Sequence, residues 1–260
     1  MPFVTSRDGT RIAYATQGSG KPLLVVGGAF SDHTTGAELA AELATEFMIV
    51  TYDRRGRGES GDAPDYAVQK ELDDLAALLS VTGEGTVLLG FSSGAMLVLE
   101  SARQGTASGP LILVEPPYLL DESRPRPPLD FPARLTGLVE AGRRGDAVEL
   151  FQADFIGMPR QIVEQLRHAP FRPGLEAMAQ TTAYDAMIAG DLALDPALPR
   201  AIRQPVLTLA GTDSTPFLQE TAMALAGLVP DGRFVGIAGM NHSLTPALAP
   251  AIRAFLKQGA

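Results

Sequence analysis

Short, strongly apolar runs alternate with longer amphipathic segments through the first half of the chain, and this alternation limits the possible folds more than any other feature. The runs are rich in branched residues and are followed by glycine or polar residues, as is typical of strands buried on both faces of a sheet. They lie at residues 23–26, 47–50, 86–89 and 111–114. Between them, apolar residues recur at helical spacing in segments 34–45, 68–80 and 94–104. We therefore predict an α/β fold, with a mostly parallel sheet flanked by helices.

A proline-rich stretch interrupts this alternation. Residues 116–132 contain six prolines, which cannot continue a strand or a helix interior. Helical segments without strands follow, and strand–helix alternation resumes at 205–210. We expect a core formed by residues 1–115 and 204–260, with a helical insertion at 116–203.

Composition excludes several functional classes. The 260 residues include 21 basic and 30 acidic side chains, a net charge of −9 that argues against binding to nucleic acid or anionic membranes. Without cysteine, the chain has no disulfide and no thiolate nucleophile. We find neither a signal-peptide core nor a stretch approaching the roughly 20 apolar residues of a membrane span, and we expect a cytoplasmic protein.

The strongest local motif is Gly90-Phe91-Ser92-Ser93-Gly94, a G-x-S-x-G pattern that follows an apolar strand and opens a helix. This is the setting of a nucleophile elbow, a tight turn that needs small residues around the serine. We predict Ser92 as a nucleophile. The amide of Ser93, at the first turn of the helix, would face a developing oxyanion.

A serine nucleophile needs a base, and the chain has three histidines. His33 lies in an early polar loop, and His168 lies in the helical insertion. His242 follows the last predicted strand, which places it at the same edge of a parallel sheet as Ser92. We therefore predict His242 as the general base.

Together these features resemble the α/β-hydrolase superfamily, in particular its cap-bearing esterases and lactonases. Gly27-Gly28-Ala29 occupies the position of the family's oxyanion loop, usually His-Gly-x, and here lacks the histidine. The resemblance implies that the amide of Gly28 or Ala29 pairs with that of Ser93 to hold an oxyanion. Segment 53–58 is interpreted as a structural turn.

The acid of the triad has two candidates. Family members often carry it in a Gly-x-x-Asp turn after the strand predicted at 205–210, but here that slot holds Ser214 and the carboxylate, Asp213, comes one residue early. Glu115 directly follows the strand after the elbow, where some α/β-hydrolases, including zearalenone lactonases, place their acid. A carboxylate after four apolar residues needs a cationic or hydrogen-bonding partner, which an imidazole supplies. We prefer Glu115 and keep Asp213 as the alternative.

The helical insertion resembles the cap of such hydrolases and carries large apolar side chains, which suggest an apolar pocket. They are Phe131, Phe151, Phe155, Met158, Phe171, Met178, Tyr184 and Met187. We expect a serine hydrolase acting on an ester or lactone of an uncharged, hydrophobic small molecule, with no metal or organic cofactor. The alternatives are a cofactor-free perhydrolase of the haloperoxidase type, a carbon–carbon bond hydrolase, or a ligand receptor with little turnover.

Overall fold

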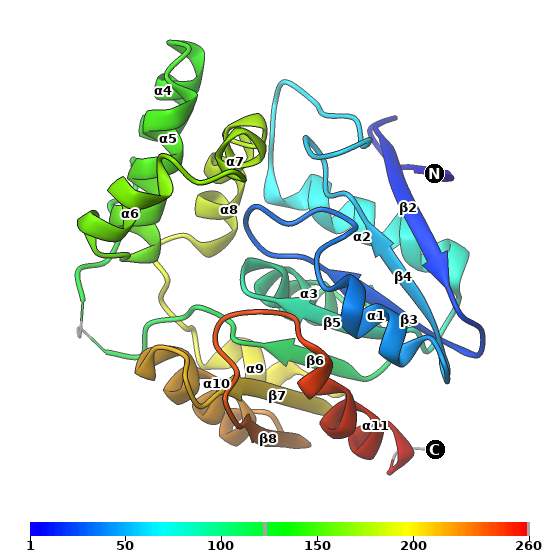
Figure 1. Cartoon of the computed structure of the whole chain (residues 1–260). Helices are drawn as coiled ribbons and strands as arrows, with labels where there is room; N and C mark the ends of the chain where they lie inside the picture. Colours follow the sequence, from blue (N-terminus) through cyan, green and yellow to red (C-terminus); the bar gives the residue numbers. More distant parts are fainter. Residues whose placement is uncertain (122–123, 259–260) are drawn as a thin grey trace.

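The computed structural model describes residues 1–121 and 124–258, which contain an eight-stranded sheet (Figure 1). Its strand order is β1-β2-β4-β3-β5-β6-β7-β8. The pairs β1–β2 and β2–β4 are antiparallel, and the other pairs are parallel. The strands are β1 (Phe3–Thr5), β2 (Arg11–Gln17), β3 (Lys21–Val26), β4 (Phe47–Tyr52), β5 (Val87–Phe91), β6 (Leu111–Val114), β7 (Val206–Gly211) and β8 (Gly232–Ile237). The predicted α/β fold with a mostly parallel sheet is confirmed.

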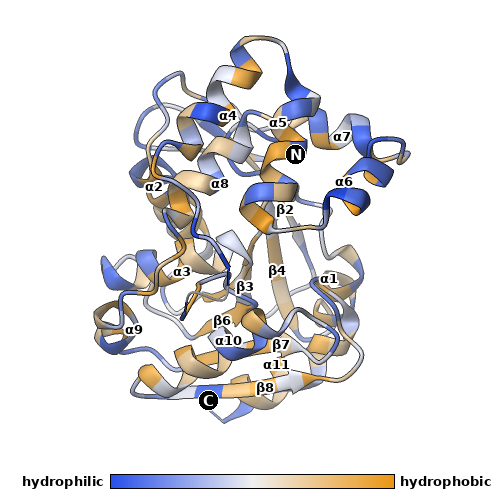
Figure 2. Ribbon diagram, turned by 90° about the vertical axis from the view of Figure 1, so that its left-hand side faces the viewer, coloured by the Kyte–Doolittle hydropathy of each residue, from blue (hydrophilic) through white to orange (hydrophobic). Residues whose placement is uncertain are grey.

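Helices cover both faces of the sheet because the central strands are apolar on both sides. On β5, Leu88 belongs to a core shared with α2 and α3, while its neighbour Leu89 belongs to a second core shared with α1 and α11. Figure 2 shows these strands as largely hydrophobic at the centre of the molecule. The core helices are α1 (Ala37–Leu43), α2 (Val68–Thr82), α3 (Ser93–Arg103), α10 (Pro216–Leu228) and α11 (Ala249–Lys257), the last preceded by the 3-10 helix η2 (Pro246–Leu248).

A helical insertion separates β6 from β7, as expected. Its helices from α4 to α8 lie beyond the carboxyl edge of the sheet (Figure 1), whereas α9 packs beside α3 and α10 of the core. Figure 2 shows hydrophilic residues on α6 and α7. The helices of the insertion are α4 (Phe131–Glu140), α5 (Arg144–Leu150), the π-helix η1 (Phe151–Ile156), α6 (Arg160–Leu166), α7 (Arg172–Ala177), α8 (Thr181–Ala189) and α9 (Ala197–Ala201).

A turn separates α7 from α8 in the insertion. The hydroxyls of Thr181 and Thr182 donate to the carbonyls of Met178 and Ala179, at 2.8 and 2.7 Å. Such local bonds compete with helical hydrogen bonds and favour a turn at this point.

Candidate active site

Ser92 lies on a sharp turn between β5 and α3. Its φ of 55° and ψ of −124° are unusual for a residue with a side chain, and such strain is found mainly at functional sites. A Cβ atom at Gly90 would lie 2.5 Å from the Cα of Ala95, and one at Gly94 would overlap the carbonyl of Val26. The turn therefore requires both glycines of the motif. Among the described residues, the Ser92 hydroxyl has no hydrogen-bond partner, His242 included, and it lines the pocket described below.

Glu115 lies immediately after β6, next to the elbow, and is fully buried. Its Oε2 is 2.5 Å from Nδ1 of His242. Its Oε1 accepts a hydrogen bond from the amide of Gly211 at 2.8 Å and another from the Ser214 hydroxyl. A buried carboxylate is costly unless such partners compensate its lost hydration. Ser214, which replaces the aspartate of the usual slot, thus acts as a donor to the glutamate on the neighbouring strand.

Asp213, the alternative acid, lies elsewhere. Its side chain is exposed, and its Oδ1 accepts a hydrogen bond from the Thr212 hydroxyl at 3.2 Å. The structure therefore brings Glu115, and not Asp213, into contact with His242.

The three histidines have different environments. His242 follows β8 and packs its ring against Phe91, with centroids 4.6 Å apart. With 41% of its side chain exposed, it opens into the same pocket as Ser92. Nδ1 of His33 is 2.9 Å from Oδ1 of Asp53, and His168 is exposed on the insertion. Of the three, His242 alone lines the pocket.

Backbone amides approach the elbow from two sides. A Cβ atom at Gly28 would lie 2.7 Å from the Cβ of Ser92, so the loop after β3 passes very close to the serine. Among the described residues, the amides of Gly28, Ala29 and Ser93 donate to no protein acceptor. Ala29 and Ser93 line the pocket, whereas Gly28 does not. Of the two loop residues predicted as oxyanion donors, Ala29 therefore lies at the pocket.

The pocket has a volume of about 620 Å³ and lies between the sheet edge and the insertion. Of the eight large apolar residues noted in the insertion, Phe151, Phe155 and Met158 line it. Of the others, Phe171 is exposed, and Tyr184 stacks on Tyr66 with centroids 3.8 Å apart. Apolar side chains dominate the lining, so the pocket suits a hydrophobic substrate portion.

Comparison with known proteins places this geometry in a family. Residues 23–252 match the alpha/beta hydrolase family. The chain belongs to this family. An alpha/beta hydrolase structure from Sphaerobacter thermophilus is 42% identical, covers 98% of this chain and 100% of its own, and has a TM-score of 0.92. A thermophilic esterase from Thermogutta terrifontis is 27% identical, covers 99% and 98%, and has a TM-score of 0.71. A non-heme haloperoxidase from Rhodococcus erythropolis is 28% identical over 98% of both chains.

In this α/β-hydrolase, buried arginines of segment 53–58 hold the loop beside the serine. Nη1 of Arg57 donates to the carbonyls of Gly28 at 2.5 Å and Ser31 at 3.2 Å. Its Nη2 donates to Oδ2 of Asp185, on α8 of the insertion, at 2.6 Å. Segment 53–58 therefore has a structural role, as interpreted. Through Arg57 it also contacts the loop that passes beside Ser92. Burial, followed by the nearby Arg54, lowers the pKa of Arg57.

Asp185 connects the insertion to the elbow and was not identified from the sequence. Its Oδ1 accepts hydrogen bonds from Nη1 of Arg54 and from the Ser93 hydroxyl, both at 2.7 Å. Burial acts to raise the pKa of Asp185, but Arg57, Arg54 and the Ser93 hydroxyl outweigh it and lower the pKa. The carboxylate thus stays charged and bridges two elements far apart in the chain.

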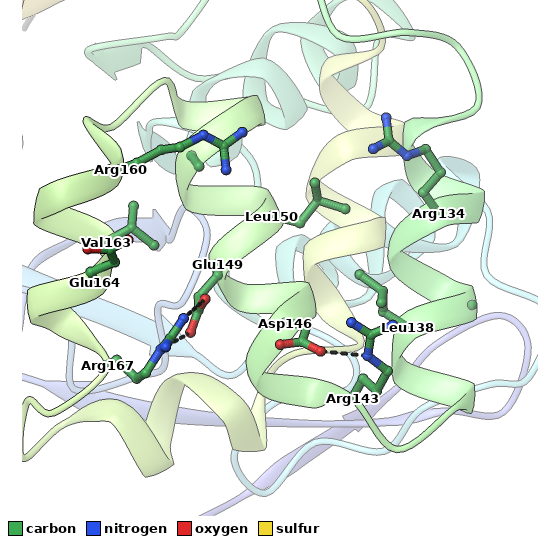
Figure 3. Close-up of a pocket in the computed structure, with 12 residues that line it drawn as sticks. Arg134, Leu138, Arg143, Asp146, Glu149, Leu150, Arg160, Val163, Glu164 and Arg167 are labelled. Carbon is green, nitrogen blue, oxygen red and sulfur yellow. Dashed lines mark hydrogen bonds and ion pairs between the residues drawn. The ribbon is translucent and has the colours of Figure 1, made fainter.

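A second hollow, of about 630 Å³, is lined by residues of α4, α5 and α6 in the insertion (Figure 3). Its charged side chains largely neutralise one another: Arg143 pairs with Asp146 at 2.6 Å, and Arg167 pairs with Glu149 at 2.6 Å. None of the predicted catalytic residues lines it.

Neither a metal site nor a membrane span is evident in residues 1–121 and 124–258. No group of three or more His, Asp or Glu side chains in this part could hold a metal ion. No helix within the same described ranges has the length and hydrophobicity to cross a membrane.

Proposed function

We propose that the protein is a serine hydrolase that cleaves a carboxylic ester or lactone whose body is mainly hydrophobic. One observation carries this proposal: Ser92 and the Glu115–His242 pair meet at one apolar pocket. In this proposal, residues 116–203 form a cap over a core of residues 1–115 and 204–260. The related esterase supports ester chemistry.

The proposed reaction passes through an acyl-enzyme. Ser92 Oγ attacks the substrate carbonyl while Nε2 of His242 takes its proton, and Glu115 fixes the imidazole tautomer and stabilises the imidazolium. The tetrahedral intermediate then expels the alkoxide, which takes the proton from His242, and leaves an acyl-enzyme. Water, deprotonated by His242, attacks the acyl-enzyme, releases the acid and restores Ser92.

The oxyanion of each intermediate needs donors. The amides of Ser93 and Ala29 supply two, and each donor of this kind contributes about 3–4 kcal/mol to the transition state. The dipole of α3, whose first residue is Ser93, adds to this stabilisation.

A panel of 4-nitrophenyl esters and lactones tests the proposed function. We expect turnover to rise from acetyl to medium-chain acyl esters because the longer chain fills the 620 Å³ apolar pocket. Initial rates across the acyl series and across γ- and δ-lactones provide the measurement. Hydrolysis confined to acetyl esters, or no hydrolysis at all, would contradict the proposal.

Arg57 is proposed as a positioning residue for the oxyanion donor. The carbonyl of Gly28 and the amide of Ala29 belong to one planar trans peptide, so a guanidinium that fixes the oxygen also fixes the direction of the N–H. Asp185 in turn holds this guanidinium.

We expect Arg57→Lys to lower kcat by about 10- to 100-fold with little change in KM, because a displaced donor weakens transition-state binding. A lysine cannot reproduce the planar fork that bridges two carbonyls and a carboxylate. Arg55→Lys is the matched control, since Arg55 is equally buried but bonds to Asp74 and Asp8, away from the loop. Equal kinetic losses in both variants would indicate a general folding effect instead.

A second candidate function, cofactor-free perhydrolysis, is favoured by the similarity to a non-heme haloperoxidase over 98% of the chain. Hydrogen peroxide would replace water in attacking the acyl-enzyme and would release a peracid. Peracid formation that outpaces hydrolysis in a mixture of ester and peroxide would favour this alternative.

A further inference from the structure

Arg124 brings a positive charge to the mainly apolar pocket. It lies between β6 and α4 and lines the same cavity as Ser92 and His242. Nη1 and Nη2 donate to the carbonyls of Ile156 and Phe155, at the end of η1, and these bonds fix the guanidinium in place.

An aromatic ring and the backbone of Gly157 lie close to the Arg124 guanidinium. The Cζ atom is 5.3 Å from the centroid of the Phe217 ring, within the range of a cation–π contact. Residue 157 is a glycine with φ of 84°, and a Cβ atom there would overlap Nη1. The guanidinium therefore lies directly against the backbone at Gly157.

Arg124 has no carboxylate partner among the described residues. Burial lowers its pKa. The other charges at the pocket are compensated, since Asp185 binds Arg54 and Arg57, and Glu115 binds His242. A half-buried cation that has no counterion in the described part of the chain would favour a bound anion.

We propose that Arg124 binds a carboxylate of the substrate, at a distance from the scissile carbonyl. Two of its five N–H groups serve the backbone carbonyls, which leaves three for a ligand, and the planar fork matches a carboxylate. This inference rests on the proposed function. It revises the expected substrate from an uncharged molecule to an ester with a hydrophobic body and a terminal carboxylate.

Paired substrates test the inference. For glutarate, adipate and suberate, the 4-nitrophenyl half-ester with a free carboxylate is compared with its 4-nitrophenyl methyl diester, which has the same chain and leaving group. We expect the wild type to favour the free acid of at least one length by about tenfold or more in kcat/KM, as a charge-assisted hydrogen bond would provide.

Arg124→Met is expected to reduce this preference by about tenfold or more, mainly through a higher KM for the free acid. Arg126→Met is the matched control. Arg126 also donates to two backbone carbonyls, those of Asp191 and Leu119, but it does not line the pocket, so its variant should keep the preference.

The outcomes separate this inference from the proposed function. If the wild type hydrolyses the methyl diesters but favours the free acid at no length, the carboxylate site is refuted and the hydrolase proposal stands. If no ester is hydrolysed, both are refuted. If Arg124→Met does not fold, as judged by its circular dichroism, two measurements still decide whether Arg124 binds the carboxylate. One is the preference of the wild type for the free acid over the methyl diester. The other is the same preference in an Arg124→Lys variant, which keeps the positive charge but loses the planar fork. An unchanged preference in a folded Arg124→Met would also overturn the inference.

Discussion

Replacing Ser92 by alanine is expected to lower kcat for the best panel substrate by about 10⁴- to 10⁶-fold, because no acyl-enzyme can form without the hydroxyl. KM should change little, since the pocket wall stays intact. Steady-state rates at saturating substrate, measured with protein whose melting temperature matches the wild type, provide the comparison.

Ser93→Ala is the control for this substitution. It removes the neighbouring hydroxyl, which donates to Asp185 at 2.7 Å, but it keeps the backbone amide proposed for the oxyanion. We therefore expect a far smaller loss than for Ser92→Ala. A Ser92→Ala enzyme that retains a tenth or more of wild-type kcat would exclude Ser92 as the nucleophile.

Replacing Glu115 by glutamine is expected to lower kcat by about 10²- to 10⁴-fold, because the neutral amide no longer stabilises the imidazolium or fixes its tautomer. Glutamine has the same shape, and its amide oxygen can still accept the hydrogen bonds from Gly211 and Ser214. The substitution thus separates charge from packing. Values of kcat and KM, together with the urea unfolding midpoint, provide the measurement.

Asp213→Asn is the matched control for Glu115→Gln. The Asp213 side chain is exposed and does not contact His242, so we expect its kinetics to stay within about twofold of the wild type, as is usual for surface substitutions. The opposite ranking, a severe loss in Asp213→Asn and a mild one in Glu115→Gln, would assign the acid role to Asp213.

Much of this arrangement could be predicted from the sequence because local rules determine it. The glycines around Ser92 are required by a sharp turn, and the structure shows the clashes that any side chain there would cause. The ends of parallel strands share one edge of the sheet, which predicts that Glu115 and His242 lie near each other. Ser214 stands where family members often carry the acid, which favoured Glu115 as the acid here. In the structure, the Ser214 hydroxyl donates a hydrogen bond to Glu115.

The contributions of the insertion could not be predicted in the same way. Asp185 and Arg124 are single charged residues in a helix and a connecting segment, and their positions depend on how those segments pack on the core. No spacing rule relates Asp185 to Ser93, which is 92 residues away in the chain. For the same reason, helical spacing alone could not separate the apolar residues that line the pocket, such as Phe151, from those that do not, such as Phe171.

The most direct test of the central claim is the mass of the protein after treatment with a fluorophosphonate, which modifies activated serines covalently. We predict one adduct on the wild type, mapped by peptide fragmentation to Ser92, and none on Ser92→Ala. A folded wild type that stays unmodified, or an adduct on another residue, would contradict the proposed nucleophile.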